Sequence, residues 1–119
     1  PQDLALIDAR KAVTMFRKVE NPLLGVVENM SYFLAPDTGK RYDIFGHGGA
    51  RAEADRIAVP FLGEIPLTID IRERSDAGTP IVHADPENEV SRIYRDIAAQ
   101  VWAQLSQGSR RKAPTIVFE

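Results

Sequence analysis

Apolar residues recur at intervals of three and four positions near both ends of the chain. They stand at positions 6, 9, 13 and 16 near the N-terminus, and at positions 90, 93, 97, 101 and 105 near the C-terminus. This spacing is typical of amphipathic helices. We expect one helix over residues 3–19 and another from Asp85-Pro86 to a stop at Gly108. The alanine-rich residues 50–58 are expected to form a further helix.

Two nearly continuous apolar runs, at residues 23–29 and 59–65, have the character of strands buried on both faces. A helix is expected between them, so they are predicted to be parallel. Residues 30–45 carry aromatic and β-branched residues on both sides of the turn-forming segment 35–39, which predicts a short hairpin. The polar stretch 67–78 is expected to be a loop with one or two helical turns.

This order of elements predicts an α/β fold, a parallel sheet covered by helices with a short β-hairpin excursion. Two parallel strands need neighbouring strands and helices on both faces. We therefore expect residues 1–108 to be the C-terminal part of a larger domain, whose missing strands precede residue 1. Oligomerisation that covers the open edge is the alternative. Residues 109–119, basic and then apolar, are expected to form a loosely held tail.

Composition narrows the function mainly by exclusion. The net charge of -2 provides no basic field for a nucleic acid backbone or an acidic membrane surface. The longest strongly apolar stretch, at residues 22–27, is far shorter than the roughly 20 residues that span a bilayer. With no signal-peptide pattern, the protein is expected to be cytoplasmic. The absence of cysteine, with only two isolated histidines, predicts neither a disulfide nor a metal site.

Three segments carry a resemblance to a known family: PQDLALIDARKAVTMF at 1–16, LLGVVENMSYF at 23–33, and IFGHGGARAEADRIAVPFLGEIPLTIDIRERSDAGTPIV at 44–82. In this order they resemble the C-terminal half of the Mrp/ApbC family of P-loop ATPases, which are of the MinD/ParA type. The resemblance implies a parent protein that binds ATP and Mg²⁺ and hydrolyses ATP slowly. It also implies a homodimer that assembles or transfers iron-sulfur clusters to client proteins.

The phosphate-binding loop of that family is absent from this chain. No G-x-x-x-x-G-K-[ST] motif or related glycine-rich segment is present to cradle phosphates with backbone N–H groups. The resemblance implies that the magnesium-binding aspartates also precede residue 1. We therefore expect no catalytic residue in this chain, and no hydrolysis by it alone.

The resemblance does imply one edge of the nucleotide site. Asn29 ends the predicted strand 23–29, at the end of a parallel sheet where ligands bind, and matches the family asparagine that reads the adenine edge. Its carboxamide offers a donor and an acceptor together. Pro66 matches the segment beside the base, and Arg72 and Asp76 in the following loop are further candidates. The alternative is that Asn29 only caps the strand end or holds the next turn.

The family also holds a bridging [4Fe-4S] cluster through a C-P-x-C pair, because such clusters need thiolate ligands. The matching stretch here is Ala35-Pro36-Asp37-Thr38, so Ala35 and Thr38 replace both cysteines. The hairpin is then expected to serve as a structural turn or dimer contact. A second function stays open: a cluster-free interaction or regulatory module of a MinD/ParA-like ATPase.

Two further motifs have simpler interpretations. The glycine-rich segment 46–49 resembles an anion-binding nest or a dinucleotide fingerprint, but Arg51 stands where a third glycine belongs. A tight turn before a helix is the favoured interpretation. The alternating carboxylates and arginines of residues 70–76 are typical of a solvated, charge-paired face.

Overall fold

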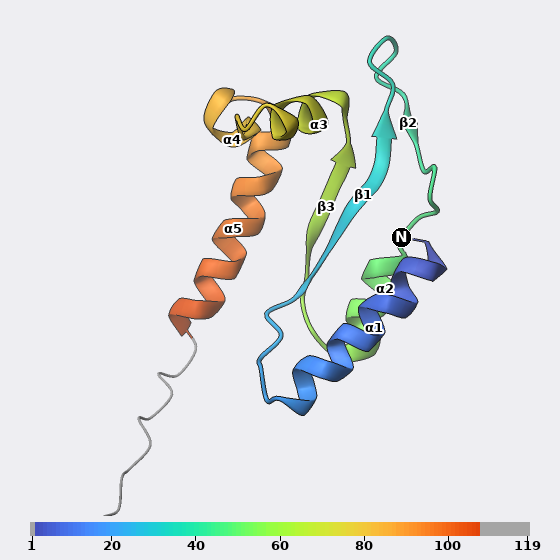
Figure 1. Cartoon of the computed structure of the whole chain (residues 1–119), viewed down its shortest axis with the longest axis vertical. Helices are drawn as coiled ribbons and strands as arrows, with labels where there is room; N and C mark the ends of the chain where they lie inside the picture. Colours follow the sequence, from blue (N-terminus) through green and yellow to red (C-terminus); the bar gives the residue numbers. More distant parts are fainter. Residues whose placement is uncertain (1, 108–119) are drawn as a thin grey trace, which may run out of the picture.

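The computed structural model describes residues 2–107, drawn as the coloured ribbon in Figure 1. The helices and strands in this range follow in the order α1 (Asp3–Lys18), β1 (Val26–Leu34), β2 (Arg41–Tyr42), α2 (Gly49–Ile57), β3 (Phe61–Leu67), α3 (Ile69–Asp76), α4 (Ile81–Ala84) and α5 (Glu89–Gln107). The predicted tail at 109–119 and the helix stop at Gly108 lie outside the described residues.

The strands form one mixed sheet in the order β2-β1-β3 (Figure 1). β1 and β3 are parallel, and Asn29 lies opposite Ile65 in their register. β1 and β2 are antiparallel, with Phe33 opposite Tyr42. The predicted parallel pair and the predicted hairpin are therefore both confirmed, and the long strand β1 takes part in both.

The boundaries of the two parallel strands differ from those expected. The hydrophobic pattern predicts a strand over 23–29, whereas β1 begins at Val26 and continues to Leu34. The apolar residues 23–27 are only partly buried, so the expected burial on both faces is not found. Pairing with β2 extends β1 into the hairpin. β3 was expected to end before Pro66 and includes it. Pro66 lacks an N–H donor and is accommodated beside an irregularity in the pairing with β1.

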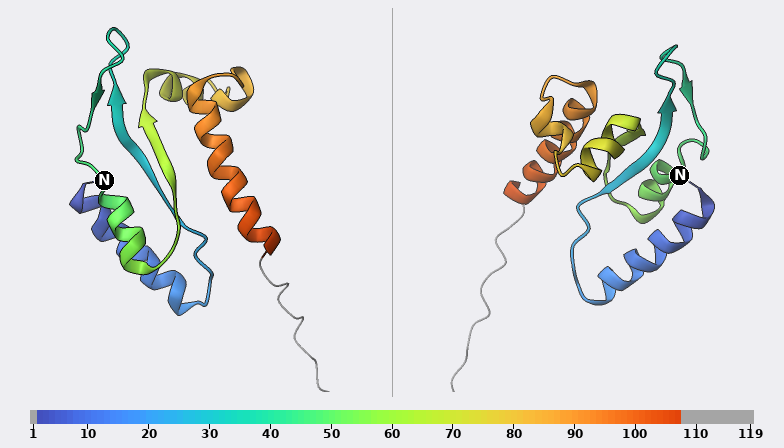
Figure 2. Two further views of the ribbon diagram at one scale, coloured as in Figure 1. Left: turned by 180° about the vertical axis from the view of Figure 1, so that it is seen from behind. Right: turned by 45° about the horizontal axis from the view of Figure 1, so that its top comes forward.

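The helices cover the sheet from two sides. Figures 1 and 2 show α1 and α2 side by side on one side of the strands, with α5 along β3 on the other. α2 buries Ala50, Ala54 and Ile57, which share one helical face. On α5, the side chain of Gln100 donates a 2.8 Å hydrogen bond to the Leu62 carbonyl of β3.

Two arginines fasten α1 to α2. Arg10 Nε lies 2.9 Å from Glu53 Oε2, and Arg17 Nη2 donates to the Ile57 carbonyl at 2.8 Å. No residue of α1 is buried, and a cavity of about 180 Å³ separates it from β1 and α2. Leu6, Val13 and Phe16 of α1 are partly buried, so these arginine contacts add to an incomplete apolar packing. Within residues 2–107, no helix combines the length and apolarity needed to cross a membrane.

Candidate functional site at the end of the parallel strands

An irregular segment interrupts the parallel pairing of β1 and β3. Asn29 pairs with Ile65 and Phe33 with Leu67, so residues 30–32 of β1 lie opposite the single residue Pro66. Such an insertion is a β-bulge, a feature that re-aims side chains. We call residues 29–33 the β1 bulge. The sequence predicts that Asn29 is the last residue of its strand, but β1 continues to Leu34. Asn29 is instead the last residue before the regular pairing with β3 breaks.

The Asn29 side chain is exposed and has one internal hydrogen bond. Its Oδ1 accepts from the backbone N–H of Met30 at 2.9 Å. Met30 has a φ of 52°, in the left-handed region that non-glycine residues seldom adopt. Within residues 2–107, no hydrogen bond uses the Asn29 Nδ2 group. The carboxamide oxygen therefore holds the local turn, while its two N–H donors remain available to a ligand.

A small cavity of about 120 Å³ lies beside this carboxamide. Gln2, Ala5, Asn29, Met30 and Phe45 line it, from the start of α1, the β1 bulge and the loop before α2. The Met30 side chain is 47% exposed. Apolar walls with a few amide groups suit the flat face and polar edge of a heterocycle.

Sequence reasoning missed the buried carboxylate that precedes Asn29. Glu28 is only 2% exposed, and its Oε2 accepts from the Ala50 backbone N–H at 2.8 Å. Its Oε1 accepts from the fully buried Ser31 hydroxyl at 2.5 Å, and that hydroxyl also lies 3.0 Å from Glu64 Oε1. The signal in the sequence was an acidic residue within an apolar run, which needs polar partners if the run is buried.

The glycine-rich segment 46–49 forms the turn into α2. Gly48 is the N-cap residue with a φ of 72°, a conformation that glycine adopts without strain. The Glu28 carboxylate lies at the start of this helix, where unpaired N–H groups favour an anion. The tight-turn interpretation is confirmed, and the anion at this helix start is a side chain of the protein itself.

Arg41 connects the hairpin to the sheet. Its guanidinium stacks 4.0 Å from the centre of the Tyr32 ring and lies 3.6 Å from Glu64. Arg41 Nε binds Asp43 Oδ1 at 2.9 Å, and Nη2 lies 3.2 Å from Nδ1 of the exposed His47. The hydrogen bond with Asp43 is the main cause that raises the pKa of Arg41 above its ordinary value.

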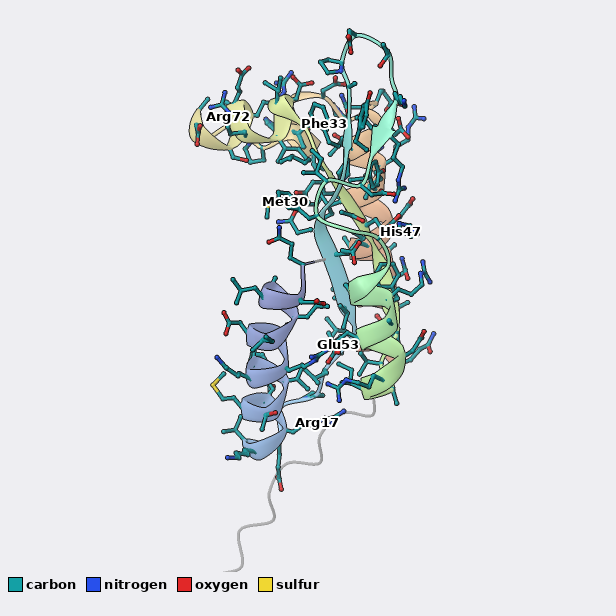
Figure 3. The ribbon with its side chains drawn as sticks, turned by 90° about the vertical axis from the view of Figure 1, so that its right-hand side faces the viewer. Arg17, Met30, Phe33, His47, Glu53 and Arg72 are labelled. Carbon is teal, nitrogen blue, oxygen red and sulfur yellow. The ribbon has the colours of Figure 1, made fainter. Side chains whose placement is uncertain are left out.

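The other predicted nucleotide contacts are not gathered at one point. Pro66 lies opposite the β1 bulge, but its side chain is fully buried. Arg72 and Asp76 pair with each other on α3 at 3.1 Å, and Arg72 also binds Glu73 at 3.0 Å. Figure 3 shows Arg72 well apart from Met30. The structure therefore brings Pro66 to Asn29 and confirms the charge-paired face on α3.

The residues at the hairpin tip do not fit an iron-sulfur cluster. The Ala35 N–H donates to the Lys40 carbonyl at 3.0 Å, and Thr38 Oγ1 accepts from the Lys40 N–H at 3.3 Å. Ala35 offers no ligand atom, and the Thr38 oxygen is already used within the turn. Elsewhere in residues 2–107, no group of three or more His, Cys, Asp or Glu side chains is placed to hold a metal.

Known proteins resemble this chain along most of its length. Residues 1–102 match the ParA-type family described as NUBPL iron-transfer P-loop NTPase. The iron-sulfur cluster carrier protein of Deinococcus radiodurans is 50% identical over 114 residues, which cover 96% of this chain and 32% of the relative. The iron-sulfur cluster transfer protein NUBPL of Dictyostelium discoideum is 41% identical over 123 residues, covering 99% and 38%. The chain thus spans about a third of their length.

A solved structure extends the likeness to the fold. A nucleotide-binding protein from Archaeoglobus fulgidus, in complex with ADP and with cobalt found in it, superimposes with a TM-score of 0.56 at 35% sequence identity. The match covers 69% of this chain and 32% of that protein. Fold and sequence agree, and the chain belongs to the NUBPL family of ParA-type iron-transfer P-loop NTPases.

Proposed function

We propose that this chain forms part of an ATP-binding protein that assembles or transfers iron-sulfur clusters. The observation that carries the proposal is the 50% identity to a protein named as an iron-sulfur cluster carrier, along 96% of the chain. In this proposal, residues 1–108 are the C-terminal part of the nucleotide-binding domain and 109–119 its tail. The phosphate loop and the magnesium ligands belong to the remainder of a longer polypeptide, which acts in the cytoplasm.

The contribution of this chain to the nucleotide site is its base-binding edge. Asn29 presents its Nδ2 donors to acceptor nitrogens of adenine, while its oxygen stays bound to the Met30 N–H. Met30 and Phe45 supply the apolar wall of the adjoining cavity. Pro66 supports the bulge from beneath, and Arg72 and Asp76 act only if the bound nucleotide opens their ion pair. ATP hydrolysis is slow and depends on groups outside this chain.

The hairpin is proposed to be part of a homodimer surface. Its second strand, β2, pairs with β1 only at Phe33 and Leu34. The tip of the hairpin projects away from the core (Figure 1). Ile44, which follows β2, is 56% exposed. A projecting hairpin with apolar residues at its base can pack against the same element of a second subunit. Client proteins that receive clusters would be recognised by the assembled dimer.

A second candidate is supported by the hairpin tip itself. Ala35 and Thr38 stand where the resemblance implies two cysteine ligands, and the chain contains no cysteine. A protein that binds ATP without a cluster would use the hairpin for nucleotide-dependent association alone. This second candidate is a cluster-free interaction or regulatory module.

Anaerobic reconstitution separates the two candidates. The complete polypeptide that contains this chain is incubated with ferrous iron and sulfide, and visible absorption of a bound cluster is measured after desalting. The matched control is the double variant Ala35→Cys, Thr38→Cys, which restores the ligand pair on the same hairpin. A coloured wild type supports the carrier function through other ligands. A colourless wild type that binds ATP, beside a coloured double variant, supports the cluster-free module.

A further inference from the structure

We infer that Glu28 is a positioning residue for Asn29, holding the β1 bulge in the conformation that presents the Asn29 carboxamide to a base. The inference rests on the proposed nucleotide-binding function and assigns a role to a side chain that does not itself reach the ligand. Glu28 is 2% exposed, whereas the Asn29 side chain next to it is exposed. Side chains at neighbouring positions can divide these tasks because they point to opposite faces of a strand.

The burial of Glu28 is tolerated because both of its oxygens are bound. An isolated carboxylate is costly to remove from water, and hydrogen bonds must replace its hydration. Glu28 Oε2 takes the Ala50 N–H at the start of α2, and Oε1 takes the Ser31 hydroxyl. One partner lies on another element of the fold and the other within the bulge. Glu28 therefore ties the β1 bulge to α2.

Glu28 and Ser31, which are hydrogen-bonded to each other, flank the strained part of the bulge. Asn29 and Met30 lie between Glu28 and Ser31, and Met30 has a φ of 52°. A non-glycine residue stays in this conformation only where its surroundings hold it there. The Ser31 hydroxyl is buried and bound to Glu28, and the Asn29 carboxamide holds the Met30 N–H. The hydrogen bond between Asn29 and Met30 and the hydrogen bond from α2 to Glu28 therefore constrain the same four residues, 28–31.

Loss of the hydrogen bond between Glu28 and α2 changes where the Asn29 carboxamide points. Strand side chains alternate between faces, so moving the pairing by one residue transfers a side chain to the opposite face. Between the pairs Asn29–Ile65 and Phe33–Leu67, the β1 bulge has two more residues than the strand opposite it. A bulge released from α2 can shift toward more regular pairing, and the Asn29 carboxamide then leaves the cavity that it shares with Met30 and Phe45.

The test compares two buried glutamates. Glu28→Gln keeps one oxygen for the Ala50 N–H but replaces the other by an N–H₂ group, which can only donate. The Ser31 hydroxyl then no longer donates to residue 28 and turns to Glu64 Oε1. Glu53→Gln makes the same change at a residue that is 4% exposed and binds Arg10 and Arg56, away from the bulge (Figure 3). Ser31→Ala is a milder variant that removes only the hydroxyl. Each is made in the complete polypeptide, and affinity for ATP and GTP is measured by calorimetry together with the melting temperature.

We expect Glu28→Gln to weaken ATP binding about tenfold, because hydrogen bonds to a neutral amide are weaker than those to a carboxylate, and to reduce the preference for ATP over GTP. Ser31→Ala should lower the ATP affinity and the preference for ATP over GTP by a smaller factor. Glu53→Gln should lower the melting temperature but leave that preference unchanged. A folded Glu28→Gln protein with wild-type preference overturns the inference. If Glu28→Gln does not fold, Ser31→Ala decides by the same criterion.

Hydrogen exchange of the Met30 amide tests the role of Glu28 in the bulge independently of nucleotide binding. A wild type that binds no ATP would refute the nucleotide function, yet the role of Glu28 in the bulge would still be measurable. Faster exchange of the Met30 amide in Glu28→Gln and Ser31→Ala, with unchanged exchange in Glu53→Gln, supports positioning. Equal exchange in all of these proteins overturns it.

Discussion

Arg10 of α1 binds the buried carboxylate of Glu53 on α2, with 2.9 Å between Nε and Oε2. Arg56 binds the same carboxylate from within α2 through its Nε at 3.0 Å. The hydrogen bond from Arg56 is the largest cause that lowers the pKa of Glu53, from 4.5 to about 2, and Arg10 lowers it further against the opposing effect of burial. This carboxylate joins α1 to α2.

The lowered pKa of Glu53 predicts an acid-dependent part of the stability. A carboxyl group with a lower pKa in the folded state stabilises that state fully above its unfolded pKa of 4.5, and the effect disappears as the pH falls toward about 2. We expect the difference in unfolding free energy between wild type and Glu53→Gln to be largest near pH 6 and to shrink through this window. Urea unfolding at several pH values measures it. A difference that stays constant with pH would contradict the assignment.

Gly25 permits the close approach of the chain before β1 to the chain before β3. A Cβ at this position would lie 2.6 Å from Leu62 Cγ and 2.7 Å from the Pro60 carbonyl oxygen, at a φ of 158°. The backbone oxygen cannot rotate away, and Pro60 also accepts the Val26 N–H that begins the strand pairing. Gly25→Ala should therefore cost about 2–5 kcal/mol of unfolding free energy.

The matched control is Gly39→Ala in the hairpin. Gly39 also has a positive φ, of 66°, but an added Cβ would meet nothing within 4 Å. Only the conformational cost applies there, about 1–2 kcal/mol. Urea unfolding of both variants should rank Gly25→Ala as the more damaging. The reverse order would show that the approach of β1 to β3 is less tight than the structure has it.

Asn29→Ala tests the proposed base contact. Removing the carboxamide eliminates the Nδ2 donors and should weaken ATP binding by the complete polypeptide about tenfold, with little effect on binding of inorganic triphosphate. Arg72→Ala is measured beside it and should lower ATP affinity only if the bound nucleotide opens the ion pairs of Arg72 with Asp76 and Glu73. Calorimetry measures all three proteins. Unchanged ATP affinity in Asn29→Ala would leave only its role in holding the Met30 turn.

The local periodicities of the chain predict most of its elements. The spacing of Leu6, Val13 and Phe16 predicts α1, and the alanine-rich segment predicts α2. The turn residues 35–39 predict the hairpin. The structure confirms it, because the Ala35 N–H donates to the Lys40 carbonyl across the turn. These features depend on residues within about one or two turns of each other, so a single sequence is enough to indicate them. The family resemblance, through Asn29, also indicated the end of the sheet at which the candidate site lies.

The arrangement of the site was decided by contacts between distant segments. No local pattern predicts that β1 continues to Leu34, because that depends on its partner Arg41–Tyr42. Nor does one predict the β1 bulge, which depends on the register with β3. Glu28 and Ala50 are 22 positions apart, and only the packing of α2 on the sheet gives that carboxylate its partner. The sequence by itself determined most of the helices and strands, and through the family resemblance it made Asn29 the candidate base contact. Tertiary structure decided which atoms of Asn29 stay available, because hydrogen bonds between segments set the backbone that carries it.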